Sequence, residues 1–214
     1  EIHRLSNKLE ESLYSAMEDY SISHKLGNKE IVNINIAPFC LIGATTCPGK
    51  LTTPLRDRFD IHHSMEFYSD EELAIIVKAN ANKLNLKVAD ENTLISLAAR
   101  SRGTPRIANR LLKRVRDYSQ IENNGLINLD CINQTLELEG IDNSGLSKLD
   151  KRYIFTLFKI YNAGPAGIDA IAASMGDDKI TVSEVVEPFL VRKQFIARTK
   201  QGRILTKKGI EYIL

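Results

Sequence analysis

Arg106 carries the clearest chemical signal in this sequence. It follows Thr104 and Pro105, which are residue types preferred at the N-cap and the first position of a helix. The unpaired amides of a helix N-terminus attract anions, so a cation placed there needs a negatively charged partner. A phosphate group meets that need, and we therefore predict that Arg106 binds phosphate.

Two threonines follow residues 39–44, an unbroken apolar run typical of a strand buried in a parallel sheet. Such strands carry their chemistry at the C-terminal end, which makes Thr45 and Thr46 candidate site residues. A threonine at a strand end is also common in proteins without a site there.

Two arginines, Arg56 and Arg58, flank Asp57. The fixed charge of an arginine can neutralise negative charge that grows on a transferring phosphoryl group. The alternative is an ion pair within the chain, and we expect that role for Arg56.

The net charge of +2 is too small to indicate nucleic-acid binding, but the basic residues are unevenly distributed. Residues 100–116 hold six arginines and one lysine, and residues 192–208 hold seven basic residues, with no acidic residue in either stretch. Each stretch can be a solvated face. In the second, however, Arg198 and Arg203 lie on either side of a Lys-Gln-Gly turn, from which both can project toward one duplex backbone.

The composition excludes several classes of protein. At 214 residues and 43% hydrophobic, the chain is long enough for about one to three compact domains. No apolar run approaches the roughly 18 residues of a membrane span. The sequence starts at Glu1 with neither a methionine nor a signal-like apolar stretch, so we expect a preceding segment. The three cysteines form no C-x-x-C pair, which argues against a disulfide framework or a zinc site. We expect a soluble protein of a reducing cytoplasm.

The apolar spacing predicts a helix, a hairpin and then a helical section. A helix that ends near residue 20 is indicated by four residues recurring every four positions, namely Leu5, Leu9, Leu13 and Met17. Residues 22–26 and 31–36 flank Gly27-Asn28 and are typical of a β-hairpin. Ser69 and Glu72 form a capping box that opens a helix, and further helices are expected over about 90–100, 104–118 and 132–139.

Residues 142–145 are a linker by composition, and we place a domain boundary there. Beyond it, helices are predicted over 149–161 and 168–175. A third helix should begin at a capping box of Thr181 and Glu184, and Pro188 should kink it or end it early. Strand-like residues 195–206 then predict a hairpin. Three helices followed by a basic hairpin is the order of a winged-helix domain.

Four motifs occur in a set order, namely Glu1-Ile2-His3-Arg4, Gly43-Ala44-Thr45-Thr46, Pro54-Leu55-Arg56-Asp57-Arg58-Phe59 and Arg102-Gly103-Thr104-Pro105-Arg106. They resemble the RuvB family of AAA+ ATPases, and the resemblance runs along essentially all 214 residues. It implies an α/β plus all-α fold. A partial P-loop AAA+ ATPase core would cover residues 1–68, a helical lid residues 69–141, and a C-terminal winged-helix DNA-binding head residues 146–214.

The resemblance also implies roles for single residues. Glu1 stands where the family has the glutamate that polarises the attacking water, although a frayed terminal residue is the alternative. Thr46 stands at the sensor-1 position, Arg58 at the arginine finger that reaches the neighbouring subunit's nucleotide, and Arg106 at the sensor-2 position. The other residues placed around the nucleotide are Glu18, Asp19, Tyr20 and Tyr68.

As a function, the resemblance implies an ATP-driven motor that promotes branch migration of Holliday junctions in recombination and DNA repair, working as a homo-hexameric ring. Its cofactors are ATP or ADP and Mg²⁺. Its partners are DNA, contacted by Arg198 and Arg203, then RuvA, docked on the hairpin 22–36, and the RuvC resolvase in a larger complex. The residues near the hairpin tip give no apolar anchor, being His24, Lys25, Lys29 and Glu30.

The sequence contains no G-x-x-x-x-G-K-[ST] loop, so the principal phosphate and Mg²⁺ ligands are expected upstream. We expect no ATP hydrolysis by these residues alone. Two other functions stay open here, a non-catalytic winged-helix DNA-binding protein and a clamp-loader-like AAA+ ATPase. Thr46 and Arg58 argue against the first, and the basic winged head argues against the second. A winged helix can also be a protein-docking module.

Overall fold

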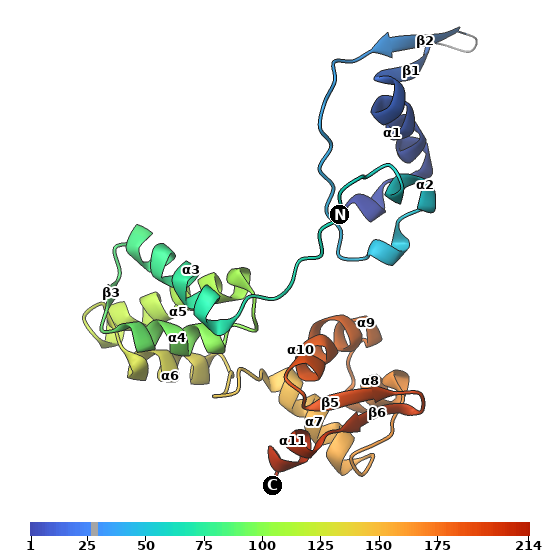
Figure 1. Ribbon diagram of the computed structural model, residues 1–214. Coiled ribbons are helices and arrows are strands. Elements are labelled where there is room, and N and C mark those ends of the chain that lie inside the picture. Colours follow the sequence, from blue (N-terminus) through green and yellow to red (C-terminus); the bar gives the residue numbers. More distant parts are fainter. Residues whose placement is uncertain (27–29) are drawn as a thin grey trace. The chain divides into compact units, whose positions relative to one another are not determined.

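The computed structural model describes residues 1–26 and 30–214 (Figure 1). The chain divides into two compact units, Glu1–Met65 and Glu66–Leu214. In the described part of the chain, no helix is both long and apolar enough to cross a membrane.

The first unit contains one long helix and one antiparallel hairpin. A short 3-10 helix (Ile2–Arg4) precedes α1 (Asn7–Asp19), and β1 (Ser21–Leu26) then pairs with β2 (Glu30–Asn35). A second 3-10 turn (Pro48–Lys50) and the short helix α2 (Thr53–Arg56) follow. The predicted helix and hairpin are therefore confirmed, whereas the Gly27-Asn28 turn lies outside the described residues.

The strand expected over residues 39–44 does not form, and that prediction is wrong. A strand needs a hydrogen-bonding neighbour along its edge. This segment is instead tied to the 3-10 helix by one bond, in which the Ile2 N–H donates to the Ala44 carbonyl at 2.9 Å. Ile42 is 88% exposed. An apolar run indicates that a segment tends to be buried, but it does not show whether a neighbouring strand is present to pair with it.

The second unit begins with four helices that share one apolar core. They are α3 (Asp70–Lys83), α4 (Glu91–Ala99), α5 (Pro105–Glu122) and α6 (Leu129–Leu138). The predicted Ser69–Glu72 capping box is present at the start of α3. The core residues without exposure include Leu73, Leu97, Leu111 and Ile132. The parallel strands β3 (Lys87–Val88) and β4 (Leu126–Ile127) have two residues each, too few to show a sequence pattern.

The rest of this unit has the predicted winged-helix order around its own core. Helices α7 (Lys148–Lys159) and α8 (Ile168–Met175) come first, and a third helical stretch consists of α9 (Lys179–Thr181), a π-helical turn (Val182–Val186) and α10 (Glu187–Arg192). The wing is the antiparallel pair β5 (Ile196–Thr199) and β6 (Gly202–Leu205). A last helix, α11 (Lys207–Glu211), was not predicted.

The third helical stretch begins earlier than expected, and the Thr181–Glu184 capping box is wrong. Asp178 is the N-cap, because its carboxylate accepts the Thr181 N–H at 3.0 Å. Pro188 does not end the helix, which continues to Arg192. The π-helical turn directly before it widens the backbone where proline would otherwise clash with the preceding turn.

Glu187 connects the helices of this domain to its wing. The side chain has no solvent exposure, yet it accepts hydrogen bonds from the Tyr153 hydroxyl at 2.8 Å and from Arg203 Nε at 2.9 Å, and lies 2.7 Å from Arg198 Nη2. Burial, followed by the charge of Glu187, raises the pKa of Tyr153, so the phenol stays neutral and donates. A buried carboxylate is tolerated when it is paired and hydrogen-bonded in this way.

We predict that Glu187→Ala destabilises the protein by about 3 to 5 kcal/mol, because Arg203 and Tyr153 lose their buried acceptor. Urea denaturation followed by circular dichroism measures this. The matched control is Asp169→Ala, which breaks an exposed ion pair with Lys179 and should cost less than about 1 kcal/mol. Equal losses in the two variants would contradict the assignment.

Candidate functional site

The structure brings together Glu1 and Thr46, the predicted catalytic pair of the first unit. The Thr46 N–H donates to Glu1 Oε2 at 3.1 Å, and the Thr46 hydroxyl lies 3.2 Å from both carboxylate oxygens. His3 Nδ1 supports the pair, at 3.1 Å from Glu1 Oε2 and 2.8 Å from the Thr45 hydroxyl. Gly43 lies close to the same segment, since a Cβ there would come within 2.9 Å of Ile2 Cδ1.

These contacts set the protonation state of Glu1. The hydrogen bond from the Thr46 backbone holds the pKa of Glu1 below its ordinary value, and the Thr46 hydroxyl acts in the same direction. The carboxylate is therefore ionised at neutral pH, as a group that accepts a proton or orients water must be.

Arg58 is held by three groups of its own unit. Its Nη2 lies 2.7 Å from Glu18 Oε1, its Nη1 donates to the Pro54 carbonyl at 2.9 Å, and its guanidinium carbon lies 4.1 Å from the centre of the Tyr14 ring. Its Nε is buried and has no hydrogen-bond partner within the described ranges. Two predicted site residues, Arg58 and Glu18, are thus in direct contact.

Arg56 forms the ion pair with Asp57 that we expected, at 3.8 Å and with both side chains more than half exposed. Such a pair contributes little to stability. The two neighbouring arginines therefore differ in their surroundings, one exposed and the other partly enclosed.

Tyr20 and Arg58 line the same small cavity of about 290 Å³. Tyr20 ends α1 in the left-handed conformation at φ 50°, and its ring meets Phe39 edge to face at 6.3 Å. Asp19, the last residue of α1, is exposed. The cavity lies just below the usual size range of small-molecule sites, so it can hold only part of a nucleotide.

In the second unit, Arg106 and Tyr68 lie around the same turn. Arg106 is exposed in the first turn of α5, as predicted, and makes no ion pair with any described residue. The N-cap Thr104 makes no side-chain capping bond, so the first amides of α5 stay available to an anion. The Tyr68 N–H donates at 3.1 Å to the carbonyl of Gly103, three residues before Arg106.

The described residues do not assign Mg²⁺ to a site. Among residues 1–26 and 30–214, no group of three or more His, Cys, Asp or Glu side chains is arranged to hold a metal ion. The side chains in contact with Glu1 are those of Thr46 and His3. Mg²⁺ prefers carboxylates, phosphates and water, so this set suits water activation and not metal binding.

Arg198 and Arg203 are directly opposite each other on the wing, as the sequence suggested. Both contact Glu187, but Arg198 is 50% exposed whereas Arg203 is 23% exposed. Arg198 also borders a surface groove of about 730 Å³ with Lys207 and Lys208 of α11. Arg198 therefore has the greater freedom to meet an external phosphate.

Three family models match consecutive parts of the chain. They describe the RuvB P-loop domain of a Holliday junction DNA helicase over residues 1–65, the RuvB AAA lid domain over residues 68–142, and the RuvB C-terminal winged-helix domain over residues 143–214. The solved Thermotoga maritima RuvB, a Holliday junction branch migration motor, is 43% identical with a TM-score of 0.84. The match covers 100% of this chain and 67% of that one.

The chain belongs to the RuvB family. A point mutant of the same Thermotoga protein gives the same values, 43% identity and a TM-score of 0.84 over 100% of this chain and 67% of that one. The predicted family and fold class, with a P-loop core, a lid and a winged helix, are thereby confirmed.

Sequence reasoning missed two features of this RuvB-family chain. The first is an apolar face on the hairpin strands, where Ile22 and Ile34 are direct partners and are 38% and 51% exposed. Their alternation with polar residues is the signal in the sequence that could have predicted this face. The second is the position of Arg102 beside Asp150, at 3.2 Å. The Ser147–Asp150 spacing, which is that of a capping box, is the signal in the sequence that could have pointed to Asp150.

We predict that Thr46→Val raises the pKa of Glu1 part of the way to its ordinary value, because the backbone bond remains. A carboxyl-detected NMR titration of the labelled glutamates measures it. The lowered pKa stabilises the fold above the ordinary glutamate pKa, and this contribution is lost as the pH falls through the folded value. In the variant, the pH range between the folded pKa and the ordinary glutamate pKa, over which this contribution is lost, should be narrower. Thr53→Val, at an exposed position, is the matched control, and an equal shift there would overturn the assignment.

Proposed function

We propose that this chain is part of an ATP-driven DNA motor subunit that promotes branch migration of Holliday junctions in recombination and DNA repair. The observation that carries the proposal is the ionised Glu1 carboxylate bound by Thr46 through its amide and hydroxyl. A chain of the RuvB family that served only to bind DNA would have no need for a fixed hydrolytic carboxylate.

The chemistry is hydrolysis of the terminal phosphoryl group. Water attacks the γ-phosphorus, the bond to the bridging oxygen breaks, and ADP and phosphate leave. Glu1 accepts a hydrogen bond from the attacking water, and the Thr46 hydroxyl turns from Glu1 to the water or to a γ-phosphate oxygen. Because Glu1 and Thr46 already touch, one water molecule can meet both.

Around the nucleotide we place Arg106 on the phosphates and the remaining predicted residues at the nucleoside, namely Glu18, Asp19, Tyr20 and Tyr68. The uncapped amides at the start of α5, and the lack of an ion pair between Arg106 and any residue that the structure describes, support this role. We infer that the phosphate-binding loop and the Mg²⁺ ligands come from residues outside this sequence, and that these 214 residues do not hydrolyse ATP by themselves.

We infer that Arg58 acts in trans within a homo-hexamer. Its partner Glu18 is 57% exposed, and an exposed ion pair exchanges at low cost. A phosphate from the neighbouring subunit, with more negative charge than a carboxylate, can therefore displace Glu18. The buried Nε, still without a partner among the described residues, gains an acceptor if the guanidinium rotates out.

In the full-length protein, Arg58→Ala should leave ATP binding nearly unchanged and lower kcat by about 10³-fold or more, because the loss falls on the transition state. Steady-state phosphate release measures kcat. Arg56→Ala, which breaks only an exposed pair, is the matched control and should stay near the normal rate.

Rings that contain two kinds of subunit test whether Arg58 acts on the nucleotide of the neighbouring subunit. Subunits carrying Glu1→Gln and subunits carrying Arg58→Ala should each be inactive, whereas mixing them should restore turnover at interfaces that combine an intact Glu1 with an intact Arg58. No restoration in confirmed mixed oligomers would show that Arg58 does not serve a neighbour.

We propose that the wing contacts duplex DNA through Arg198 and Arg203, with Lys207 and Lys208 at the side of the adjoining groove. Because the Arg198 side chain is more exposed than that of Arg203, we assign the main phosphate contact to Arg198, whereas Arg203 mainly holds the wing to Glu187. Backbone contacts of this kind are independent of sequence, as a motor moving along any DNA requires.

Arg198→Ala should weaken binding to a four-way junction and lower the slope of log affinity against log salt by about 0.9, the value for one lost phosphate contact. Fluorescence anisotropy at several salt concentrations measures it. Arg152→Ala, which removes an exposed arginine of α7, is the matched control. An unchanged slope for Arg198→Ala would exclude that residue from the DNA contact.

We propose that RuvA docks on the apolar face of the β1–β2 hairpin, which Ile22 and Ile34 supply, with RuvC joining a larger complex. Adjacent exposed aliphatic side chains on paired strands suit such an interface. The bacterial cytoplasm, where DNA and ATP are both present, is the proposed location.

A further inference from the structure

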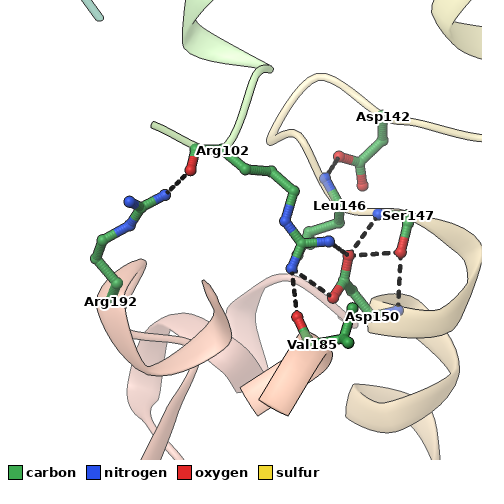
Figure 2. A network of polar contacts seen from close by, with 7 residues as sticks. All are labelled: Arg102, Asp142, Leu146, Ser147, Asp150, Val185 and Arg192. Atoms are coloured by element: carbon green, nitrogen blue, oxygen red, sulfur yellow. Dashed lines mark hydrogen bonds and ion pairs between the residues drawn. The ribbon is translucent and has the colours of Figure 1, made fainter. Parts of the chain in front are cut away.

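Arg102 occupies an unusual backbone position next to a predicted site residue. It lies in the turn between α4 and α5, four residues before Arg106, with a left-handed φ of 57°. A residue with a side chain adopts this conformation only where its surroundings hold it there. Figure 2 shows that its side chain points away from the lid and toward the winged-helix domain.

The side chain of Arg102 completes a buried polar site in the winged-helix domain. Its Nη1 lies 3.2 Å from Asp150 Oδ2, and its Nη2 donates to the Val185 carbonyl at 2.9 Å (Figure 2). Its guanidinium also stacks over Phe189, at 4.2 Å from the ring centre. Asp150 has no exposure and also accepts the N–H and hydroxyl of Ser147, at 2.8 and 2.6 Å. Arg102 therefore supplies the opposite charge that this buried carboxylate needs.

A second arginine fixes the same turn from the other direction. Arg192 of α10 donates through Nη2 to the Arg102 carbonyl at 2.6 Å and stacks over Phe67 at 3.9 Å. The next residue, Gly103, has a left-handed φ of 68°, which favours glycine, and a Cβ there would lie 2.5 Å from Arg192 Nη1, so the arginine would have to shift. The winged-helix domain thus holds both the side chain and the backbone of Arg102.

The lid and the winged-helix domain have separate apolar cores that share no residue. Each core explains the folding of its own domain, but neither explains how one domain is oriented on the other. Polar contacts provide that link, at the linker through Tyr212 and Asp142, and at the turn before Arg106 through Arg102. Only the contact at the turn is continuous with the proposed phosphate-binding residue.

We propose that Arg102 is a positioning residue that joins the lid and the winged-helix domain into one lever, so that displacement of Arg106 by a nucleotide phosphate moves the wing on DNA. The functional part of this inference rests on the proposed function, but the rigid connection does not. Two measurements separate them.

The first measurement follows the connection itself. Spin labels on exposed residues of the lid and head, at Gln120 and Lys207, report the distance between the domains after Cys40 and Cys47 are changed to serine. The distribution should be narrow in the parent protein and clearly broader in Arg102→Ala combined with Asp150→Asn. The second substitution removes the unpaired buried charge and keeps a capping oxygen, so that the domains stay folded. An equally narrow distribution would overturn the proposal.

Arg100→Ala is the matched control for this experiment. Arg100 lies two residues earlier and donates to Asn133 within the lid at 2.7 Å, so its loss should leave the distance distribution unchanged. Equal broadening in this variant would mean that any change in the turn loosens the domains and would also overturn the specific role of Arg102.

The second measurement uses the full-length protein. The Arg102→Ala, Asp150→Asn variant should keep its affinity for ATP within about two-fold, whereas the distance migrated per ATP should fall by about ten-fold, within the usual range of coupling between sites. Arg102→Lys, which keeps the charge, should recover part of the loss. Unchanged migration per ATP would overturn the lever. No ATPase in the unsubstituted protein would overturn the proposed function instead, and the spin-label distances would still decide the connection.

Discussion

A carboxylate with no access to water must be paired with a cation, and this constraint organises the second unit. Asp150 and Glu187 both have zero exposure and are both compensated by arginines from other elements. Glu187 draws the wing onto the helices, and Asp150 draws the α4–α5 turn onto the winged helix. Removing one partner of a buried pair costs about 3 to 5 kcal/mol, a large share of the stability of a domain. The geometry of the unit is therefore specified by a few charged contacts in addition to its two apolar cores.

The first unit uses the same kinds of side chain near water, with a different result. Arg58 pairs with an exposed Glu18, and Glu1 is bonded to Thr46 at the surface. An exposed ion pair contributes about 0 to 1 kcal/mol, so a substrate can replace it. The pairs of the two units differ in strength because the carboxylate is buried in the second unit and exposed in the first. A motor needs both kinds of contact, one that stays closed through a cycle and one that opens in each cycle.

Local signals predicted much of the fold. The Ser69–Glu72 capping box, the Thr104-Pro105 helix start and the alternation in the β1–β2 hairpin are decided by residues a few positions apart, and all are present. The failures depended on more distant partners. Residues 39–44 lack a neighbouring strand among the described residues. In the third helical stretch of the winged helix, Asp178 and Thr181 are both residue types that can cap a helix, and the structure uses Asp178. The pairing of Glu1 with Thr46 is a contact across 45 positions, and the family resemblance gave each residue a role without predicting that contact.

The roles of the arginines could not be predicted from the sequence, because they depend on the burial of the partner. Arg102, Arg106, Arg198 and Arg203 all lie in basic stretches with no acidic residue, so charge patterning treats them alike. The structure distinguishes them by their contacts with two buried carboxylates. Asp150 lies 48 positions from Arg102 in the sequence, and Glu187 lies 16 positions from Arg203. Arg102 and Arg203 meet these buried acceptors and are themselves only 18% and 23% exposed. Arg198 also contacts Glu187 but is 50% exposed, and Arg106 is exposed, so a phosphate can reach both. The different surroundings of these arginines are therefore determined by acidic residues outside both basic stretches.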